Sequence, residues 1–278
     1  MKRKYLVAWD FGPGARAALR QAMALAEDAM VVLAHVVAPG TTPSAVCAVE
    51  DELDDEAAVL RELGREVRIR VEIGPVAETL TEILDEEHPD LTLVGMRRAD
   101  STRGRLARDL LRATRVPVLA ISPDAALSGE TPRSIVVGID FGPAGDAAFD
   151  EAARLARRLH APVRLVHAQP LGEASPSLES HPAASKLEEL AARLHGVGID
   201  AAFTVALGDP AKALVAEAHG ESSAVIVVGT RDRGAVKRTL LGSVAEKVLA
   251  TAPGAVLIAK EAAAPEADRR ATWSVPVF

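Results

Sequence analysis

The stretch VVGTRDRGAVKRTLLGS, from Val227 to Ser243, holds the residue types best suited to binding an anion. Gly229 and Gly242 bracket a loop in which residues 231–238 carry four basic side chains against one acidic, a local charge of +3. Gly242 and Ser243 precede an apolar helical stretch, where free N–H groups and a serine hydroxyl could meet phosphate oxygens. The same residues fit an ordinary helix start, with serine as N-cap and the arginines solvated. These residues alone leave both interpretations open.

The composition is that of an acidic globular protein. The chain has 278 residues, of which 49% are hydrophobic, and a formal net charge of −7. An acidic balance argues against a protein that coats nucleic acid. The single cysteine, Cys47, cannot form an internal disulfide, which fits a reducing compartment. The N-terminal apolar run is too short for a signal peptide, and no segment approaches the roughly 18 apolar residues of a membrane span. We therefore predict a cytoplasmic protein without nucleic-acid or membrane partners.

The chain is a tandem duplication, which decides the fold. KYLVAWDFGPGARAALRQAMALA at Lys4 returns as RSIVVGIDFGPAGDAAFDEAARLA at Arg133, and EIGPVAETLTEILDEEHPDLTLVG returns as ALGDPAKALVAEAHGESSAVIVVG. The copies join in the turn-rich SPDAALSGETPR. We predict a first domain over residues 1–124, a second over 132–260 and a C-terminal tail over 261–278. The apolar end of the tail could dock on a sheet edge or on a partner.

Each copy alternates short β-branched runs with helical stretches rich in alanine and leucine. This pattern is typical of a parallel sheet covered by helices on both faces. For the second copy it predicts four helices between five strands, at residues 133–139, 163–168, 199–206, 224–229 and 255–259. The predicted fold class is α/β, with two tandem, doubly wound, five-stranded parallel sheets packed about a pseudo-two-fold axis. Ligands of such sheets bind outside the carboxyl ends of the strands, where the strand order reverses.

Other motifs give weaker signals. GPGARA at residues 12–17 matches the dinucleotide pattern G-x-G-x-x-A, but the next strand ends without the acidic residue that would hold a ribose, so a plain turn is favoured. No P-loop sequence occurs. No histidine or cysteine spacing suits a metal, and no catalytic set can be argued from spacing. His35 and His167 recur at the ends of the second strands, where local hydrogen bonding is the favoured interpretation.

Taken together, the repeat, the aspartates that end the first strands, and GTRDRGAVKRTLLGSVAEKVLATAPGAVLIA resemble the universal stress protein family in its tandem two-domain form. The resemblance covers about residues 2–260 and implies a Rossmann-like fold of the adenine-nucleotide alpha-hydrolase type. Nucleotide-binding members carry G-x2-G-x9-G-[ST], which holds phosphates and ribose, while the aspartate and a backbone group after strand two hold the nucleoside. Carried over, the nucleoside end falls to Gly138, Asp140 and Ala168, and the phosphate end to Val228, Gly229, Gly242, Ser243 and Val244.

The chain departs from that motif at Asp232, which stands where the family pattern has its second glycine. An aspartate adds a side chain and like charge beside a bound anion, which costs about 1 kcal/mol or more unless a cation intervenes. Arg231, Arg233 or a bound magnesium ion could offset this repulsion. We expect nucleotide binding to be weakened rather than lost.

The first copy departs further. Only eight residues separate Gly95 from Gly104, where twelve separate Gly229 from Gly242, and Arg105 stands in place of a serine. A loop four residues shorter cannot follow the same path around a triphosphate. We predict that the N-terminal half keeps the fold but has lost the standard nucleotide site.

The resemblance implies a regulatory or sensor protein of the stress response that binds ATP and is not an enzyme, or at most a slow ATPase. One alternative is a family member that binds no nucleotide and acts as a protein-interaction module. A second alternative is a weak ATPase or nucleotidyl transferase. The family makes a homodimer the expected assembly, with a pseudo-dimeric monomer as the other possibility.

Overall fold

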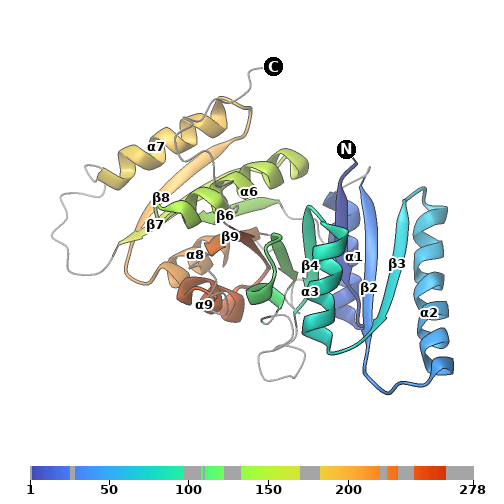
Figure 1. Ribbon diagram of the computed structural model, residues 1–278. Helices are drawn as coiled ribbons and strands as arrows, with labels where there is room; N and C mark the ends of the chain where they lie inside the picture. The colour runs from blue at the N-terminus through green and yellow to red at the C-terminus, as the bar shows by residue number, and fades with distance from the viewer. Residues whose placement is uncertain are drawn as a thin grey trace, which may run out of the picture.

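The chain folds into two halves of the same design, which lie side by side in Figure 1. The computed structural model describes residues 2–25, 29–96, 108, 110–121, 133–169, 182–219, 224–230 and 241–260. The N-terminal half contains β1 (Lys4–Ala8), α1 (Pro13–Leu25), β2 (Met30–Val37), α2 (Pro43–Glu62), β3 (Val67–Ile73), α3 (Val76–Glu87), β4 (Leu91–Gly95) and β5 (Val118–Ile121). The C-terminal half contains β6 (Ser134–Gly138), α6 (Pro143–Leu159), β7 (Val163–Gln169), α7 (Pro182–His195), β8 (Ala201–Leu207), α8 (Pro210–His219), β9 (Ala224–Thr230), α9 (Ser243–Thr251) and β10 (Ala255–Lys260). The predicted strands and helices of the second copy are confirmed, with strand ends displaced by at most two residues.

Proline sets the start of many of these helices. It is the first residue of α1, α2, α6, α7 and α8. Proline suits that position because its fixed φ angle is already helical and the N–H group that it lacks would have no partner within the helix. The turn that leads from the first strand into each half's first helix is also fixed, since Phe11 and Phe141 adopt the left-handed region at φ 57° and 54°.

The two halves share one strand order and join into a single sheet. The order across the ten strands is β3-β2-β1-β4-β5-β10-β9-β6-β7-β8, so each half has the order 3-2-1-4-5. Pairing is parallel within each half and antiparallel where β5 meets β10. Leu119 pairs with Leu257, its own counterpart in the repeat, so the pseudo-two-fold axis passes between these residues. The predicted fold class is confirmed, and the structure adds that the two sheets are continuous.

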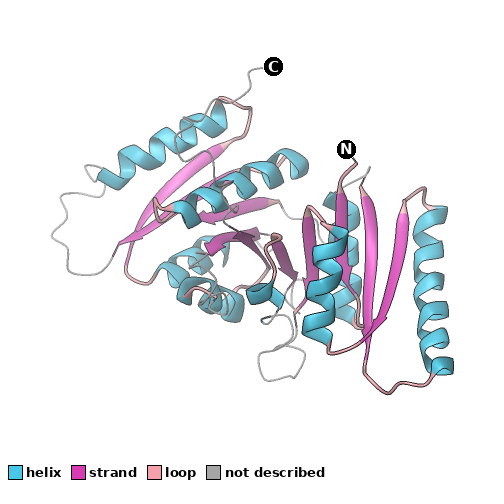
Figure 2. Cartoon of the chain, viewed as in Figure 1, coloured by secondary structure: helices cyan, strands magenta, loops and turns pink. Residues whose placement is uncertain are grey.

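Helices cover both faces of the sheet (Figure 2). On one face α1, α2, α6 and α7 contribute to one buried apolar cluster that draws residues from both halves. On the other face α8 and α9 pack over a second cluster and α3 packs over a third. The second cluster also crosses the boundary, because it contains Leu111 and Val118 together with Val248 and Val256. The halves are therefore held together by shared core on both faces.

A polar contact reinforces the boundary on the first face. Tyr5 of β1 is fully buried, and the guanidinium group of Arg158 on α6 lies 5.5 Å from the centre of its ring. Arg158 also donates a hydrogen bond to the Tyr5 hydroxyl. Burial raises the pKa of Tyr5 above its ordinary value, while the nearby Arg158 opposes that rise. This contact ties the first strand of one half to the first helix of the other.

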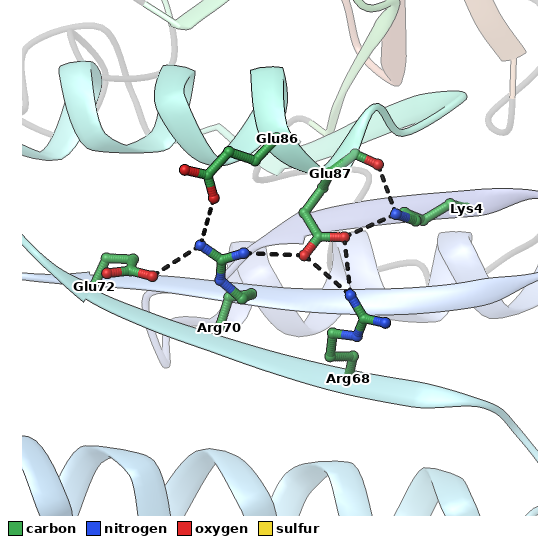
Figure 3. A network of polar contacts seen from close by, with 6 residues as sticks. All are labelled: Lys4, Arg68, Arg70, Glu72, Glu86 and Glu87. Carbon is green, nitrogen blue, oxygen red and sulfur yellow. Dashed lines mark hydrogen bonds and ion pairs between the residues drawn. The ribbon is translucent and has the colours of Figure 1, made fainter.

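A network of charged side chains fastens α3 to the sheet in the N-terminal half (Figure 3). Glu87, at the end of α3, is only 4% exposed and accepts hydrogen bonds from Lys4 at 2.8 Å, Arg70 at 3.2 Å and Arg68 at 3.3 Å. Arg70 also pairs with Glu72 and Glu86. Burial opposes ionisation of Glu87, but the hydrogen bond and charge of Lys4 and the charge of Arg68 outweigh it and lower the pKa of Glu87. The network gives the edge strand β3 a charged surface.

Within the described ranges, no helix combines the length and the apolar character that crossing a membrane requires.

Candidate functional site

A cavity of about 580 Å³ opens at the carboxyl ends of β6, β7 and β9 in the C-terminal half. It lies where the chain, having added β7 and β8 on one side of β6, returns to add β9 and β10 on the other. This reversal of strand order is the usual ligand site of an open α/β sheet. The cavity is lined by Gly138, Ile139, Asp140, Ala144, Gly145, Val166, His167, Ala168, Pro210, Leu214, Val228, Gly229, Leu241, Gly242, Ser243, Val244, Ala245 and Glu246.

The structure brings together the site residues expected from the sequence. Eight of the nine line this one cavity: Gly138, Asp140, Ala168, Val228, Gly229, Gly242, Ser243 and Val244. The ninth, Asp232, lies outside the described residues, as does the rest of the basic loop over residues 231–240. Their role in binding remains a prediction, and the geometry shows what the cavity offers a ligand.

Part of the cavity lining is apolar. A side chain at Gly138 would project into it, because a Cβ atom there would lie 3.1 Å from Leu214 Cδ1 and 3.7 Å from Val228 Cγ1. Leu214 and Pro210, both from α8, form a wall that the sequence analysis did not foresee. The apolar face of α8 gave no separate signal, since core and cavity wall require the same residue types. This part of the lining suits a flat, weakly polar ring.

Asp140 lines the cavity and also has a structural role. Its Oδ1 atom accepts hydrogen bonds from the backbone N–H groups of Gly142 at 3.0 Å and Gly145 at 2.9 Å, so it caps the start of α6. A Cβ atom at Gly145 would come within 2.6 Å of the same oxygen. In the N-terminal half, Asp10 similarly accepts from Gly12 at 2.9 Å. The repeated aspartate therefore shapes the turn that follows the first strand.

The start of α9 also lines the cavity. Gly242 is the N-cap, with φ −58° and ψ 147°, and makes no side-chain capping bond. Ser243 is the first helical residue rather than the cap, which corrects the alternative interpretation made from the sequence. The exposed N–H groups of a helix start favour an anion. A Cβ atom at Gly242 would have nothing within 4 Å, so this glycine leaves open space.

Gly229 serves packing as well as lining the cavity. A Cβ atom there would lie 1.8 Å from the carbonyl oxygen of Ala144, so only glycine lets α6 approach the end of β9 this closely. In the N-terminal half a Cβ atom at Gly95 would come within 2.3 Å of the backbone of Gly14. Gly229 was expected only as part of the phosphate end, and its contact with α6 was not predicted.

Comparison with known proteins identifies the family. A profile described as the universal stress protein family matches residues 1–122 and again residues 132–260. The chain belongs to the universal stress protein family. It contains two tandem copies of the family's domain, as the resemblance implied.

Individual universal stress proteins agree with this assignment. Universal stress protein Rv2005c of Mycobacterium tuberculosis is 32% identical over 204 residues, which are 66% of this chain and 65% of that protein. The match therefore spans just under two thirds of the length of that relative. A universal stress protein of Thermus aquaticus is 42% identical over 77 residues, 28% of this chain and 56% of that protein. The crystal structure of a universal stress protein from Archaeoglobus fulgidus has a TM-score of 0.69 at 18% identity, covering 93% of this chain and 98% of that one, which supports the fold.

The N-terminal half of this universal stress protein has larger side chains at the positions that shape the cavity. Ala8 stands in place of Gly138, Trp9 in place of Ile139 and Val36 in place of Ala168. Ala8 and Val36 pack in the buried cluster under α3. The shortened loop expected in this half falls within residues 97–107, outside the described residues, so its path stays a prediction. The larger side chains independently favour loss of the site there.

His167 takes part in local hydrogen bonding, as expected. Its Nδ1 atom lies 2.7 Å from the carbonyl oxygen of Ile139, and His35 makes the same contact with Trp9 at 2.8 Å. A carbonyl oxygen only accepts, so Nδ1 carries the hydrogen. The ring of His167 also packs against Phe141, with centroids 4.6 Å apart. Both contacts fix the histidine beside the turn that Asp140 caps.

Two ion pairs hold the helices around the cavity. Lys247 of α9 lies 2.6 Å from Asp209, which precedes α8 and caps it by accepting from the N–H of Ala211. The hydrogen bond from Lys247, together with the backbone hydrogen bonds, lowers the pKa of Asp209. From the neighbouring position on α9, Glu246 pairs with Arg112 at 2.7 Å. Helix α9 is therefore tied both to α8 and to the N-terminal half.

Proposed function

We propose that this universal stress protein binds an adenine nucleotide, ATP with magnesium, in the cavity of its C-terminal half and acts as a regulatory or sensor protein. The observation that carries the proposal is the convergence of eight residues, assigned from the family motif, on one cavity at the point where strand order reverses. The cavity volume of about 580 Å³ lies within the usual range for small-ligand sites, about 300–1,000 Å³.

Two parts of the cavity lining support this choice of ligand. The apolar part beside Leu214 and Gly138 suits the adenine ring. Gly242 and Ser243, at the start of α9, offer N–H groups without a side-chain cap to phosphate oxygens. The loop over residues 231–238 adds a local charge of +3 by its sequence. The proposal thus places a flat base and a polyanion at parts of the lining with matching chemistry.

Thermal unfolding with and without millimolar ATP and magnesium tests the proposal. A ligand that binds only the folded state raises its stability by about 2.7 kcal/mol at a hundredfold excess over its dissociation constant. We expect the wild type and Gly242→Gln to be stabilised more than Gly242→Glu. The two variants add the same bulk in open space, so their difference isolates the effect of a carboxylate at the phosphate end.

If ATP stabilises none of the three proteins, the proposal is wrong and the alternative of an interaction module without nucleotide is favoured. Asp232 in place of the motif glycine is the feature that supports this alternative. Hydrolysis is expected to be slow, because His167 is held by the Ile139 carbonyl and Asp140 caps α6, which leaves neither poised as a general base. The proposal also places the protein in the cytoplasm and expects it to act as a homodimer or as a pseudo-dimeric monomer.

A further inference from the structure

Glu246, one of the residues that line the C-terminal cavity, contacts the other half of the molecule. Arg112, within the helical residues 110–113 of the N-terminal half, donates from its guanidinium group to Glu246 Oε1 at 2.7 Å. Glu246 lies in the first turn of α9 and lines the cavity. Leu111, beside Arg112, is fully buried in the cluster that α9 covers, and its carbonyl oxygen accepts from Lys260 of β10. The segment that carries Arg112 is therefore fixed against the C-terminal half.

Glu246 places a negative charge at the part of the cavity lining that is otherwise suited to an anion. The positive end of the helix dipole attracts a phosphate group, and a carboxylate in the same turn repels that phosphate electrostatically. Arg112 does not line the cavity itself, but its ion pair with Glu246 offsets the charge of that carboxylate. The side chains are 32% and 41% exposed, so this pair adds little to folding stability. The pair should instead change the affinity of the cavity for a charged ligand.

The pair occurs once in the duplicated chain. When the repeats are aligned through Val118 and Val256, the counterpart of Arg112 is Ala250 and the counterpart of Glu246 is Arg108. These counterparts cannot form an ion pair. The contact is therefore specific to the half that has the described cavity, and it does not follow from the symmetry of the fold.

We propose that Arg112 of the N-terminal half is a specificity-determining residue of the C-terminal site, which sets how strongly the site discriminates ligands by the number of their phosphate groups. It acts by neutralising the carboxylate of Glu246 through the ion pair and by adding a positive charge near the phosphate end. The inference rests on the proposed function for the identity of the ligand as a nucleotide. The occupancy of the site is thereby coupled to the contact between the two halves.

Calorimetric titration of four proteins with adenosine, AMP and ATP tests the inference. The proteins are the wild type, Arg112→Gln, the double variant Arg112→Gln/Glu246→Gln, and Arg115→Gln as a control that removes the same charge from an exposed neighbouring site. We expect Arg112→Gln to weaken ATP binding about tenfold, AMP binding less and adenosine binding not at all. The double variant should recover most of the loss, and Arg115→Gln should match the wild type.

An equal loss for adenosine and ATP would assign Arg112 a merely structural role and overturn the inference, as would unchanged ATP binding or a double variant without recovery. Inorganic tripolyphosphate separates this inference from the proposed function, because it needs no nucleoside site. Tripolyphosphate binding that depends on Arg112, without any adenosine or ATP binding, would support the inference and refute the nucleotide. ATP binding that is unchanged in Arg112→Gln would support the proposed nucleotide and refute the inference. No binding of any of these probes would refute both.

Discussion

The two glycines that bracket the basic loop should differ strongly in how much the same substitution destabilises the protein. In Gly229→Ala the new Cβ atom would lie 1.8 Å from the Ala144 carbonyl oxygen, whereas ordinary contact begins at 3.4 Å. Helix α6 or strand β9 must therefore move by about 1.6 Å, the difference between those distances. In Gly242→Ala the new Cβ atom meets nothing within 4 Å, and the backbone angles at that position suit alanine.

The free energies follow from that geometry. Overpacking a rigid contact costs about 1–3 kcal/mol or more, and the reduced freedom of the unfolded chain returns about 0.4–1 kcal/mol. We expect Gly229→Ala to lose about 2–3 kcal/mol of unfolding free energy, which lowers the melting temperature by about 4–12 °C in a protein of this size. Gly242→Ala should stay within about 1 kcal/mol of the wild type, since it exchanges a modest loss of capping for the same entropic gain.

Urea unfolding and thermal melting of both variants measure this contrast, with Gly95→Ala as a matched variant in the N-terminal half. A Cβ atom at Gly95 would lie 2.3 Å from the backbone of Gly14, so the same loss is expected there. If Gly229→Ala were as stable as Gly242→Ala, the packing explanation for Gly229 would be refuted. Its presence in the motif would then have to be explained by the ligand alone.

Three further predictions concern the cavity and the charged contacts. Gly138→Val should weaken adenosine binding at least about tenfold while the fold persists, because its side chain fills the apolar part beside Leu214; titration with adenosine checks this. Glu87→Gln should cost about 1–3 kcal/mol at neutral pH in urea unfolding. Because the pKa of Glu87 is lowered in the folded protein, the network stabilises the folded state fully above the ordinary carboxyl pKa, and this contribution should be lost as the pH falls through the lowered pKa. Tyr5→Phe should cost about 1 kcal/mol in thermal melting, since it removes the hydrogen bond from Arg158 but keeps the ring contact.

Much of the fold was predictable because each half follows local rules. The alternation of β-branched and helical stretches located the strands of the second copy to within two residues, and the repeat carried the assignment to the first. The antiparallel pairing of β5 with β10 was not predicted. An apolar last strand indicates that some neighbour must cover it, but the sequence does not show that the neighbour is its own counterpart.

The candidate site was predictable only where it coincides with a motif. Eight of the residues expected from the family pattern line the cavity, yet Pro210 and Leu214 were missed because a cavity wall and a core helix have the same apolar pattern. The dual role of Gly229 was missed because a single glycine fits either a ligand or a helix. Arg112 and Glu246 lie 134 residues apart, and nothing local to either residue indicates the contact.

The two halves illustrate how a duplicated fold can divide its tasks. Each keeps the strand order, the capping aspartate and the glycine that admits the first helix. They differ at two positions that line the cavity in the C-terminal half, where Ala8 and Val36 of the N-terminal half instead pack in a buried cluster. The N-terminal half has larger side chains at these positions, and its Arg112 pairs with Glu246, which lines the cavity of the other half. On the proposal above, the N-terminal half therefore acts on ligand binding through Glu246 and needs no residue of its own in the cavity lining.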